Sequence, residues 1–140
     1  MLRRLIPDVV HDQDLLKLPA SATVREAAIK MRARRVGAVL ITAADGRLEG
    51  IFTERDVVTR VVADDKNPTS TTLAEVMTPN PSTIEPNRTA IEALRRMHDG
   101  GYRHLPIVSS GQLVGIVSRR DFWGIEKARV DDETKLWERI

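Results

Sequence analysis

Hydrophobic and polar positions follow the same order in two parts of the chain, 65 to 66 residues apart. In each part a Thr-x-x-Glu sequence, at Thr23 and at Thr89, is followed by hydrophobic residues three and four positions apart. Such a sequence forms a capping box, and the hydrophobic spacing predicts an amphipathic helix. The hydrophobic positions are Val24, Ala27, Ala28 and Met31 in the first copy and Ala90, Ala93, Leu94 and Met97 in the second.

Short hydrophobic runs and turn sequences surround each predicted helix. In both copies a continuous hydrophobic run predicts a buried strand, a turn ending in glycine predicts a hairpin, and a further run predicts the returning strand. A short strand precedes each helix, and a second helix ends each copy. In the first copy the predicted strands are 16–18, 38–41 and 48–52, the turn is Asp45-Gly46, and the second helix starts near Glu54. In the second copy the predicted strands are 82–84, 105–108 and 113–117, the turn is Ser110-Gly111, and the second helix starts near Arg119.

The chain therefore divides into two repeats joined by a polar linker. Residues 64–72 are polar and contain a proline, which is typical of a connecting segment. We assign 8–66 to the first repeat, 73–126 to the second and 127–140 to a C-terminal helical tail, which docks on its own chain or contacts a partner. A repeat of this size is marginally stable alone. The two should pack on each other in one α/β fold of two β-α-β-β-α units.

Composition excludes several classes of site. The chain has 140 residues, 41% hydrophobic and 4% aromatic, and a net charge of +2, which is too small to indicate nucleic-acid binding by itself. It contains no cysteine, which excludes disulfides and thiol catalysis and fits a cytoplasmic location. Its histidines lack the spacing of metal ligands. No secretory signal is evident, and no segment approaches the roughly 18 hydrophobic residues of a membrane span.

Four motifs give the sequence a family resemblance. Residues 50–56 (GIFTERD) and 115–121 (GIVSRRD) occupy matching places, and residues 76–79 (VMTP) and 102–108 (YRHLPIV) lie between them. With this order and spacing, the chain over about residues 8 to 126 resembles a tandem cystathionine β-synthase domain pair, called a CBS pair or Bateman module. The resemblance implies pseudo-twofold symmetry, clefts between the repeats that bind AMP, ADP, ATP or a related adenosine compound, and assembly into dimers.

The segment 118–121 is the main candidate for ligand contact. A strand ends here and a helix starts, and the free amides of a helix N-terminus favour a phosphate. Ser118 adds a hydroxyl, Arg120 can reach a phosphate, and the resemblance implies that Asp121 binds the ribose hydroxyls. The alternative is that Ser118 and Asp121 only cap the helix. The matching residues of the first repeat are Thr53, Arg55 and Asp56.

The two implied clefts differ in charge. The resemblance implies that Arg103 and His104, at the start of a strand, contact the ligand's phosphates, whereas uncharged residues, Gly37 and Ala38, occupy the matching positions. We therefore expect the Asp121 cleft to bind a phosphorylated ligand more tightly than the Asp56 cleft. The resemblance adds the backbone of Val36 and Gly37 at the adenine end, the stretch near Lys17, Tyr102 beside the basic pair, and Thr78 in the Asp56 cleft.

Several alternatives remain open from the sequence. The pair could be an oligomerisation scaffold without a ligand, or a basic nucleic-acid-binding module, although no aromatic residues interleave with the arginines of the first helix. NAD and S-adenosylmethionine are further adenosine ligands of the same sensor class. Ser118, His104 and Asp121 could be written as a catalytic triad, but no nucleophile elbow accompanies them. We predict no enzyme activity, no metal and no cofactor, with a homodimer or an unidentified effector protein as the readout.

Overall fold

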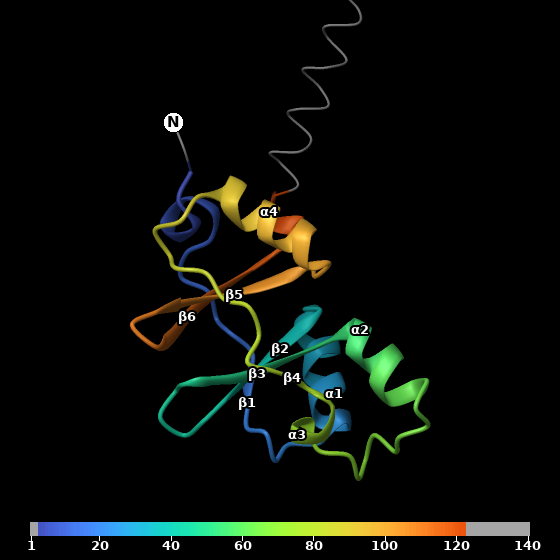
Figure 1. Cartoon of the computed structure of the whole chain (residues 1–140). Coiled ribbons are helices and arrows are strands. Elements are labelled where there is room, and N and C mark those ends of the chain that lie inside the picture. The colour runs from blue at the N-terminus through green and yellow to red at the C-terminus, as the bar shows by residue number, and fades with distance from the viewer. Residues whose placement is uncertain (1–2, 123–140) are drawn as a thin grey trace, which may run out of the picture.

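The computed structural model describes residues 3–122, which form two α/β units stacked on each other (Figure 1). Two connecting pieces precede the units, η1 (Leu5–Val9) before the first, and α3 (Leu73–Val76) with β4 (Thr78–Pro79) before the second. The first unit contains β1 (Lys17–Leu18), α1 (Val24–Arg34), β2 (Ala38–Thr42), β3 (Leu48–Thr53), α2 (Glu54–Asp56) and the helical segment η2 (Val57–Val62). The second contains α4 (Ala90–Gly100), β5 (His104–Ser109), β6 (Gln112–Ser118) and η3 (Arg119–Phe122).

The two long helices begin and end in the same way. In each, the N-cap threonine, Thr23 or Thr89, accepts a hydrogen bond from the backbone N–H of the glutamate three residues later, at 3.2 and 3.3 Å. This confirms the threonine half of each predicted capping box. The helices end at Arg35 and Gly101, both in the left-handed conformation with φ of 55° and 71°. Such a residue turns the chain out of the helix, which leads it into the next strand.

The sheets repeat the same pairing. The first sheet has the order β1-β2-β3-β4, and the second consists, within residues 3–122, of β5 and β6. β2 and β3 are antiparallel, as are β5 and β6, and both ladders carry an irregularity at the same place, after Ile41 and after Ile107. The predicted strand near 82–84 contributes one parallel bridge, from Ile84 to Ile107.

Each unit has its own hydrophobic core, and a segment from elsewhere in the chain completes each core. Leu73 of α3 is buried in the core under α1, and Leu5 of η1 is buried in the core under α4. Backbone bonds hold both segments, because the Leu73 N–H donates to Ala22 O at 2.8 Å and the Leu5 N–H donates to Arg88 O at 2.9 Å. The cores therefore do not divide at the residues where the sequence divides.

A third cluster of aliphatic side chains joins the two sheets. Leu40 and Ile51 come from the first unit and Leu113 from the second, and Leu15 and Ile116 pack against them. Burial of aliphatic surface, at about 25 cal/mol per Å², stabilises the pair of units together. The matching helices, ladders and irregularities confirm the predicted α/β fold of two repeats. The predicted tail, 127–140, lies outside the described residues.

Candidate functional site

A cleft of about 750 Å³ opens between the two repeats. Its walls come from the segment before β1, the loop from α1 into β2, the start of β5, and the junction of β6 with η3. Because both repeats contribute walls, a molecule bound here would touch both. The volume is within the range of small-molecule sites, about 300 to 1,000 Å³.

Asp121 lies on the cleft wall where β6 passes into η3. Its Oδ2 accepts the Ser118 N–H at 2.7 Å and the Ser118 hydroxyl at 3.2 Å. Both bonds use the same carboxylate oxygen, and the residue is exposed. Asp121 therefore caps η3, as the alternative from the sequence required, and still lines the cleft. The two roles are compatible.

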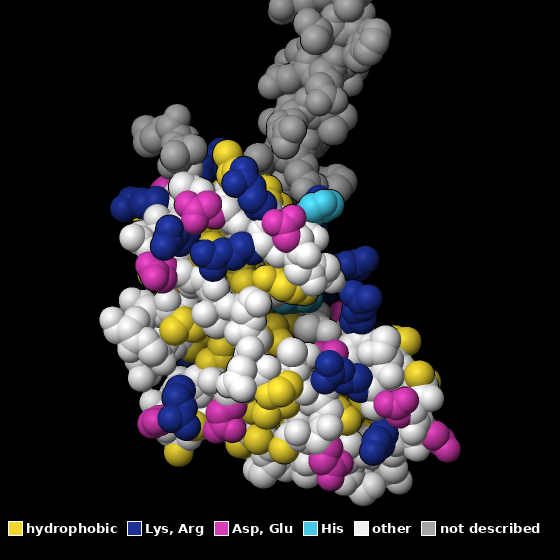
Figure 2. All heavy atoms as spheres, in the orientation of Figure 1, with side chains coloured by type: hydrophobic (Ala, Val, Ile, Leu, Met, Phe, Trp, Pro, Cys, Tyr) yellow, Lys and Arg dark blue, Asp and Glu magenta, His cyan; other side chains and the backbone are white. Residues whose placement is uncertain are grey.

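Arginines from both repeats line the same cleft. Arg35 comes from the end of α1, Arg103 from the loop before β5, and Arg120 from η3. Figure 2 shows Lys and Arg side chains at one edge of the junction between the repeats. Acidic side chains, Asp14 and Glu54, are also present on the walls. Guanidinium groups grouped in this way suit a ligand that carries phosphate or carboxylate.

His104 starts β5 and is half-buried in the cleft. Burial lowers the pKa of its imidazole below the ordinary value of 6.5. The carboxylates of Glu54 and Asp121 act to raise this pKa, and the guanidinium groups of Arg103 and Arg120 act to lower it. The neutral imidazole is therefore favoured near neutral pH, where it offers one hydrogen-bond donor and one acceptor.

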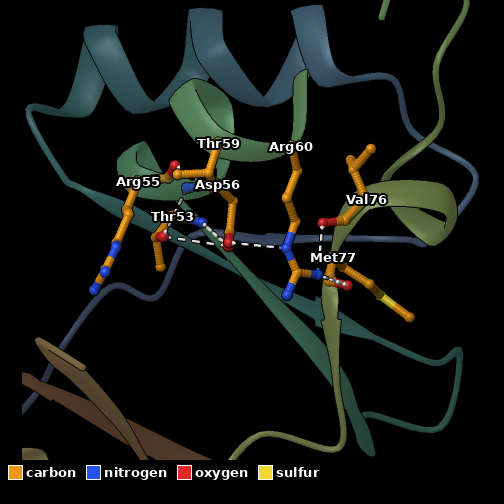
Figure 3. A network of polar contacts seen from close by, with 7 residues as sticks. All are labelled: Thr53, Arg55, Asp56, Thr59, Arg60, Val76 and Met77. Atoms are coloured by element: carbon orange, nitrogen blue, oxygen red, sulfur yellow. Dashed lines mark hydrogen bonds and ion pairs between the residues drawn. The ribbon is translucent and has the colours of Figure 1, made fainter. Parts of the chain in front are cut away.

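Asp56 occupies the matching place in the first repeat, but a local network encloses it (Figure 3). Its Oδ2 accepts the Thr53 N–H at 2.9 Å and the Thr53 hydroxyl at 3.2 Å, and its Oδ1 lies 3.6 Å from Arg60 Nε. Arg60 also donates to the carbonyls of Val76 and Met77, at 3.4 and 3.0 Å. Asp56 is only 9% exposed. Its Oδ2 thus caps α2, and its Oδ1 is linked through Arg60 to the segment that leads into β4.

Two arginines join the repeats in a reciprocal arrangement. Arg55 donates from Nη1 to Gly101 O at 3.2 Å, and Arg120 donates from Nη2 to Arg35 O at 3.5 Å. The two arginines occupy matching positions, and so do the two acceptors, which end α4 and α1. In Figure 3, Arg55 extends away from the Asp56 carboxylate. The pseudo-twofold relation therefore extends to individual side-chain contacts.

The cleft gathers part of the set of residues predicted from the sequence. Its lining includes Val36, Gly37, Arg103, His104, Ser118, Arg120 and Asp121. Lys17 is exposed in β1, although the segment just before it lines the cleft. Tyr102 packs against the second core, and Thr78 pairs with Ile51 in the first sheet. The predicted residues outside this lining are Lys17, Thr53, Arg55, Asp56, Thr78 and Tyr102.

Some cleft residues were not predicted from the sequence. Gln13, Arg35 and Glu54 all line it. Glu54 matches Arg119 in the repeat, and their backbone N–H groups donate to Gly37 O at 3.0 Å and to Arg103 O at 2.9 Å, respectively. Gln13 belongs to none of the four sequence motifs, so no pattern in the sequence marks it as a cleft residue.

Residues 3–122 contain neither a metal-binding cluster nor a membrane-spanning helix. In this part of the chain, no group of three or more His, Asp or Glu side chains is arranged to hold a metal ion. No helix of this part is long and apolar enough to cross a membrane.

Comparisons with known proteins indicate one family. The family model of the CBS domain matches residues 5–63 and again 73–122. A CBS domain-containing protein of Arabidopsis thaliana is 41% identical over 102 residues, which are 73% of this chain and 18% of the plant protein. The chain thus spans about a fifth of the length of this plant relative. An uncharacterized protein of Methanopyrus kandleri is 35% identical over 133 residues, which are 92% of this chain and 68% of that protein.

Solved structures agree with the sequence comparisons. A CBS-domain-containing protein from Agrobacterium tumefaciens superposes with a TM-score of 0.74 at 34% identity, covering 84% of this chain and 90% of that one. A CBS-domain protein from Pyrobaculum aerophilum, solved in complex with AMP, superposes with a TM-score of 0.77 at 29% identity, covering 85% and 89% of the two chains.

Proposed function

The chain belongs to the CBS-domain family of regulatory modules, and we propose that it senses an adenine nucleotide, AMP, ADP or ATP, in the cleft between its two repeats. One observation carries the proposal: a single cleft holds Asp121, Ser118, Arg103, Arg120 and the half-buried His104. These groups suit the two polar parts of a nucleotide, its ribose hydroxyls and its phosphates. The AMP complex of the Pyrobaculum aerophilum relative supports the choice of ligand class.

The ribose hydroxyls would bind the Asp121 carboxylate. Its bonds to Ser118 both use Oδ2 and hold the carboxylate in place at the cleft wall. An ordered acceptor loses little conformational freedom on binding, which favours affinity. Each hydrogen bond from a hydroxyl to this charged group would contribute about 1.5 to 3 kcal/mol.

The phosphates would bind Arg103 and Arg120, with His104 beside them. Arg120 now donates to Arg35 O over a long 3.5 Å contact. A phosphate accepts a shorter and stronger bond from a guanidinium group than a neutral carbonyl does. Binding would therefore draw Arg120 from the carbonyl of the first repeat to the ligand, while the matching contact of Arg55 with Gly101 stays in place.

This exchange gives a mechanism for sensing. The ligand replaces one direct contact between the repeats with contacts of its own to both repeats. It changes the packing of the repeats only as far as it binds one arrangement more tightly than the other. An altered packing is then read by a second copy of the chain or by an effector protein.

A homodimer is the form in which we expect this readout. Val58 and Val62 lie one turn apart on η2 and are 62% and 70% exposed, and Ile29 on α1 is 42% exposed. Clusters of large exposed aliphatic side chains are rare on monomeric proteins and mark interaction surfaces. Helices of the first repeat therefore offer the surface for a second copy.

Calorimetry tests the proposed function. Wild-type protein, freed of copurified ligand, is titrated with AMP, ADP, ATP, NAD and S-adenosylmethionine. We expect binding of at least one adenine nucleotide, weakened about tenfold or more by Arg103→Ala and unchanged by Arg25→Ala, which removes an exposed arginine of α1. Absence of binding by all five compounds would contradict the proposal and leave a ligand-free scaffold. Steeply salt-dependent binding of DNA or RNA in the same preparation would instead indicate a nucleic-acid module.

A further inference from the structure

The outer edge of β6 has an unusual partner. In the first sheet, the outer edge of β3 is paired with β4, where Ile51 faces Thr78. In the second repeat, the matching residue Ile116 is paired instead with a side chain: Gln13 Nε2 donates to Ile116 O, and the Ile116 N–H donates to Gln13 Oε1, both at 2.9 Å. The carboxamide of Gln13 thus takes the place of a peptide group.

The glycines beside these pairs show how close the replacement is. A Cβ atom on Gly50 would lie 2.9 Å from Thr78 O, and a Cβ atom on Gly115 would lie 2.9 Å from Gln13 Oε1. A side-chain oxygen in one repeat therefore occupies the place of a backbone carbonyl oxygen in the other. At Gly50 the added Cβ would also meet Met77 Sδ at 2.6 Å and a backbone oxygen, whereas at Gly115 it would meet the end of a side chain that can move aside.

The pairing with Ile116 fixes the orientation of the Gln13 carboxamide. Only one arrangement of its oxygen and nitrogen satisfies both bonds, because Ile116 offers one N–H and one carbonyl. The carboxamide has two N–H donors, and Ile116 uses one of them. The second N–H lies on a side chain that lines the cleft. It is an oriented donor with little freedom left to lose on binding.

The surroundings of Gln13 favour a base over a phosphate. Its partner Ile116 packs with Leu15 and Leu40 in the aliphatic cluster between the sheets, and all three line the cleft. Aliphatic side chains of this kind suit the flat face of an aromatic ring, whereas the arginines described above suit phosphates. A neutral, fixed N–H beside an aliphatic wall matches an unprotonated ring nitrogen.

We propose that Gln13 is a specificity-determining residue that donates its second Nε2 N–H to a ring nitrogen of the bound purine. The inference rests on the proposed function, because it concerns the same cleft, and it adds the group of the ligand that is read. The family motifs do not include this residue. A ligand without a base would bind independently of Gln13.

A cycle of protein variants and ligand analogues tests this contact. Wild type, Gln13→Met and the control Gln112→Met, which changes an exposed glutamine of the β6 hairpin, are titrated with AMP and with 1-deaza-, 3-deaza- and 7-deaza-AMP. We expect Gln13→Met to weaken AMP binding about three- to tenfold. For one deaza analogue this loss should disappear, because the nitrogen that accepts the bond is already gone. Ribose 5-phosphate should bind both proteins equally.

Gly115→Ala provides a second variant that keeps the glutamine. The added Cβ displaces the end of the Gln13 side chain, so the same analogue should again be insensitive to the substitution. Three results would each overturn the inference and leave Gln13 only as a substitute for a paired strand. They are an equal loss of affinity for AMP and all three analogues, a loss of affinity for ribose 5-phosphate, and tighter binding of AMP by Gln13→Met. If wild type binds no adenine nucleotide at all, the proposed function fails, and this inference fails with it.

Discussion

Asp56 and Asp121 hold matching positions but differ in burial and in their contacts, and paired alanine substitutions test whether they also differ in function. Each aspartate accepts the backbone N–H and the hydroxyl of the residue three positions earlier. Only Asp56 is buried, at 9% exposure, whereas Asp121 is exposed on the cleft wall. We expect Asp56→Ala to lower stability most and Asp121→Ala to lower nucleotide affinity most.

The loss of stability can be estimated from the bonds. Asp56→Ala removes two hydrogen bonds to a charged acceptor and leaves the half-buried Thr53 N–H without its partner, which costs about 2 to 4 kcal/mol. The ion pair with Arg60 adds little, because the Arg60 side chain is 44% exposed and water screens the attraction. Asp121→Ala removes an exposed cap at a cost of about 1 kcal/mol.

The loss of affinity runs in the opposite order. If Asp121 holds the two ribose hydroxyls, its removal costs at least one charge-assisted hydrogen bond, which weakens AMP binding about tenfold or more. Asp56 does not line the cleft and its oxygens are occupied by Thr53 and Arg60. Asp56→Ala should therefore change AMP affinity less than threefold once unfolded protein is accounted for.

Urea unfolding without nucleotide and calorimetry with AMP measure the two effects. Asp64→Ala, in the exposed segment between the repeats, serves as the control and should change neither. This division of roles between the two aspartates is refuted if Asp56→Ala abolishes AMP binding while Asp121→Ala leaves it intact. It is also refuted if Asp121→Ala lowers the free energy of unfolding more than Asp56→Ala does.

Two further predictions concern the histidine and the exposed valines. Burial lowers the pKa of His104 below 6.5, so as the pH falls His104 takes up a proton in the unfolded chain before it does in the folded protein. The stability of the ligand-free protein should therefore drop between about pH 7 and 5 by more than that of His104→Gln. Urea midpoints that change in parallel with pH for the two proteins would contradict this. Val58 is 62% exposed on η2, and Val58→Asp should shift the sedimentation of the protein from dimer to monomer; a monomeric wild type at micromolar concentration would contradict the dimer itself.

Local features of the fold could be predicted from the sequence because their physical causes are local. The caps at Thr23 and Thr89, the hairpin turns and the buried strands depend on residues within one turn or one strand. The exchange of segments between the cores could not be predicted in this way. Leu5 and Leu73 are each hydrophobic residues beside a repeat, and nothing local shows which of the two cores buries them.

The candidate site was predictable where a motif repeats and not where the repeat is broken. Asp121, Ser118 and Arg103 were found because they stand in motifs or at matching positions of the two copies. Gln13 was missed because its side chain pairs with the edge of β6, whereas in the first repeat the backbone of β4 pairs with the matching edge of β3. Such a replacement leaves no periodic pattern. Only the three-dimensional arrangement shows that the two edges are equivalent.

The difference in contacts between Asp56 and Asp121 nevertheless has a cause that is visible in the sequence. Asp56 is followed four residues later by Arg60, a spacing that favours an ion pair on one helix face, and the structure contains that pair at 3.6 Å. Asp121 is followed four residues later by Ile125. In the first repeat Arg60 thus pairs with Asp56, and the second repeat instead carries Arg103 just before its strand β5. Arg103 and Arg120 line the same cleft as Asp121, which is why we place the phosphorylated ligand in the Asp121 cleft.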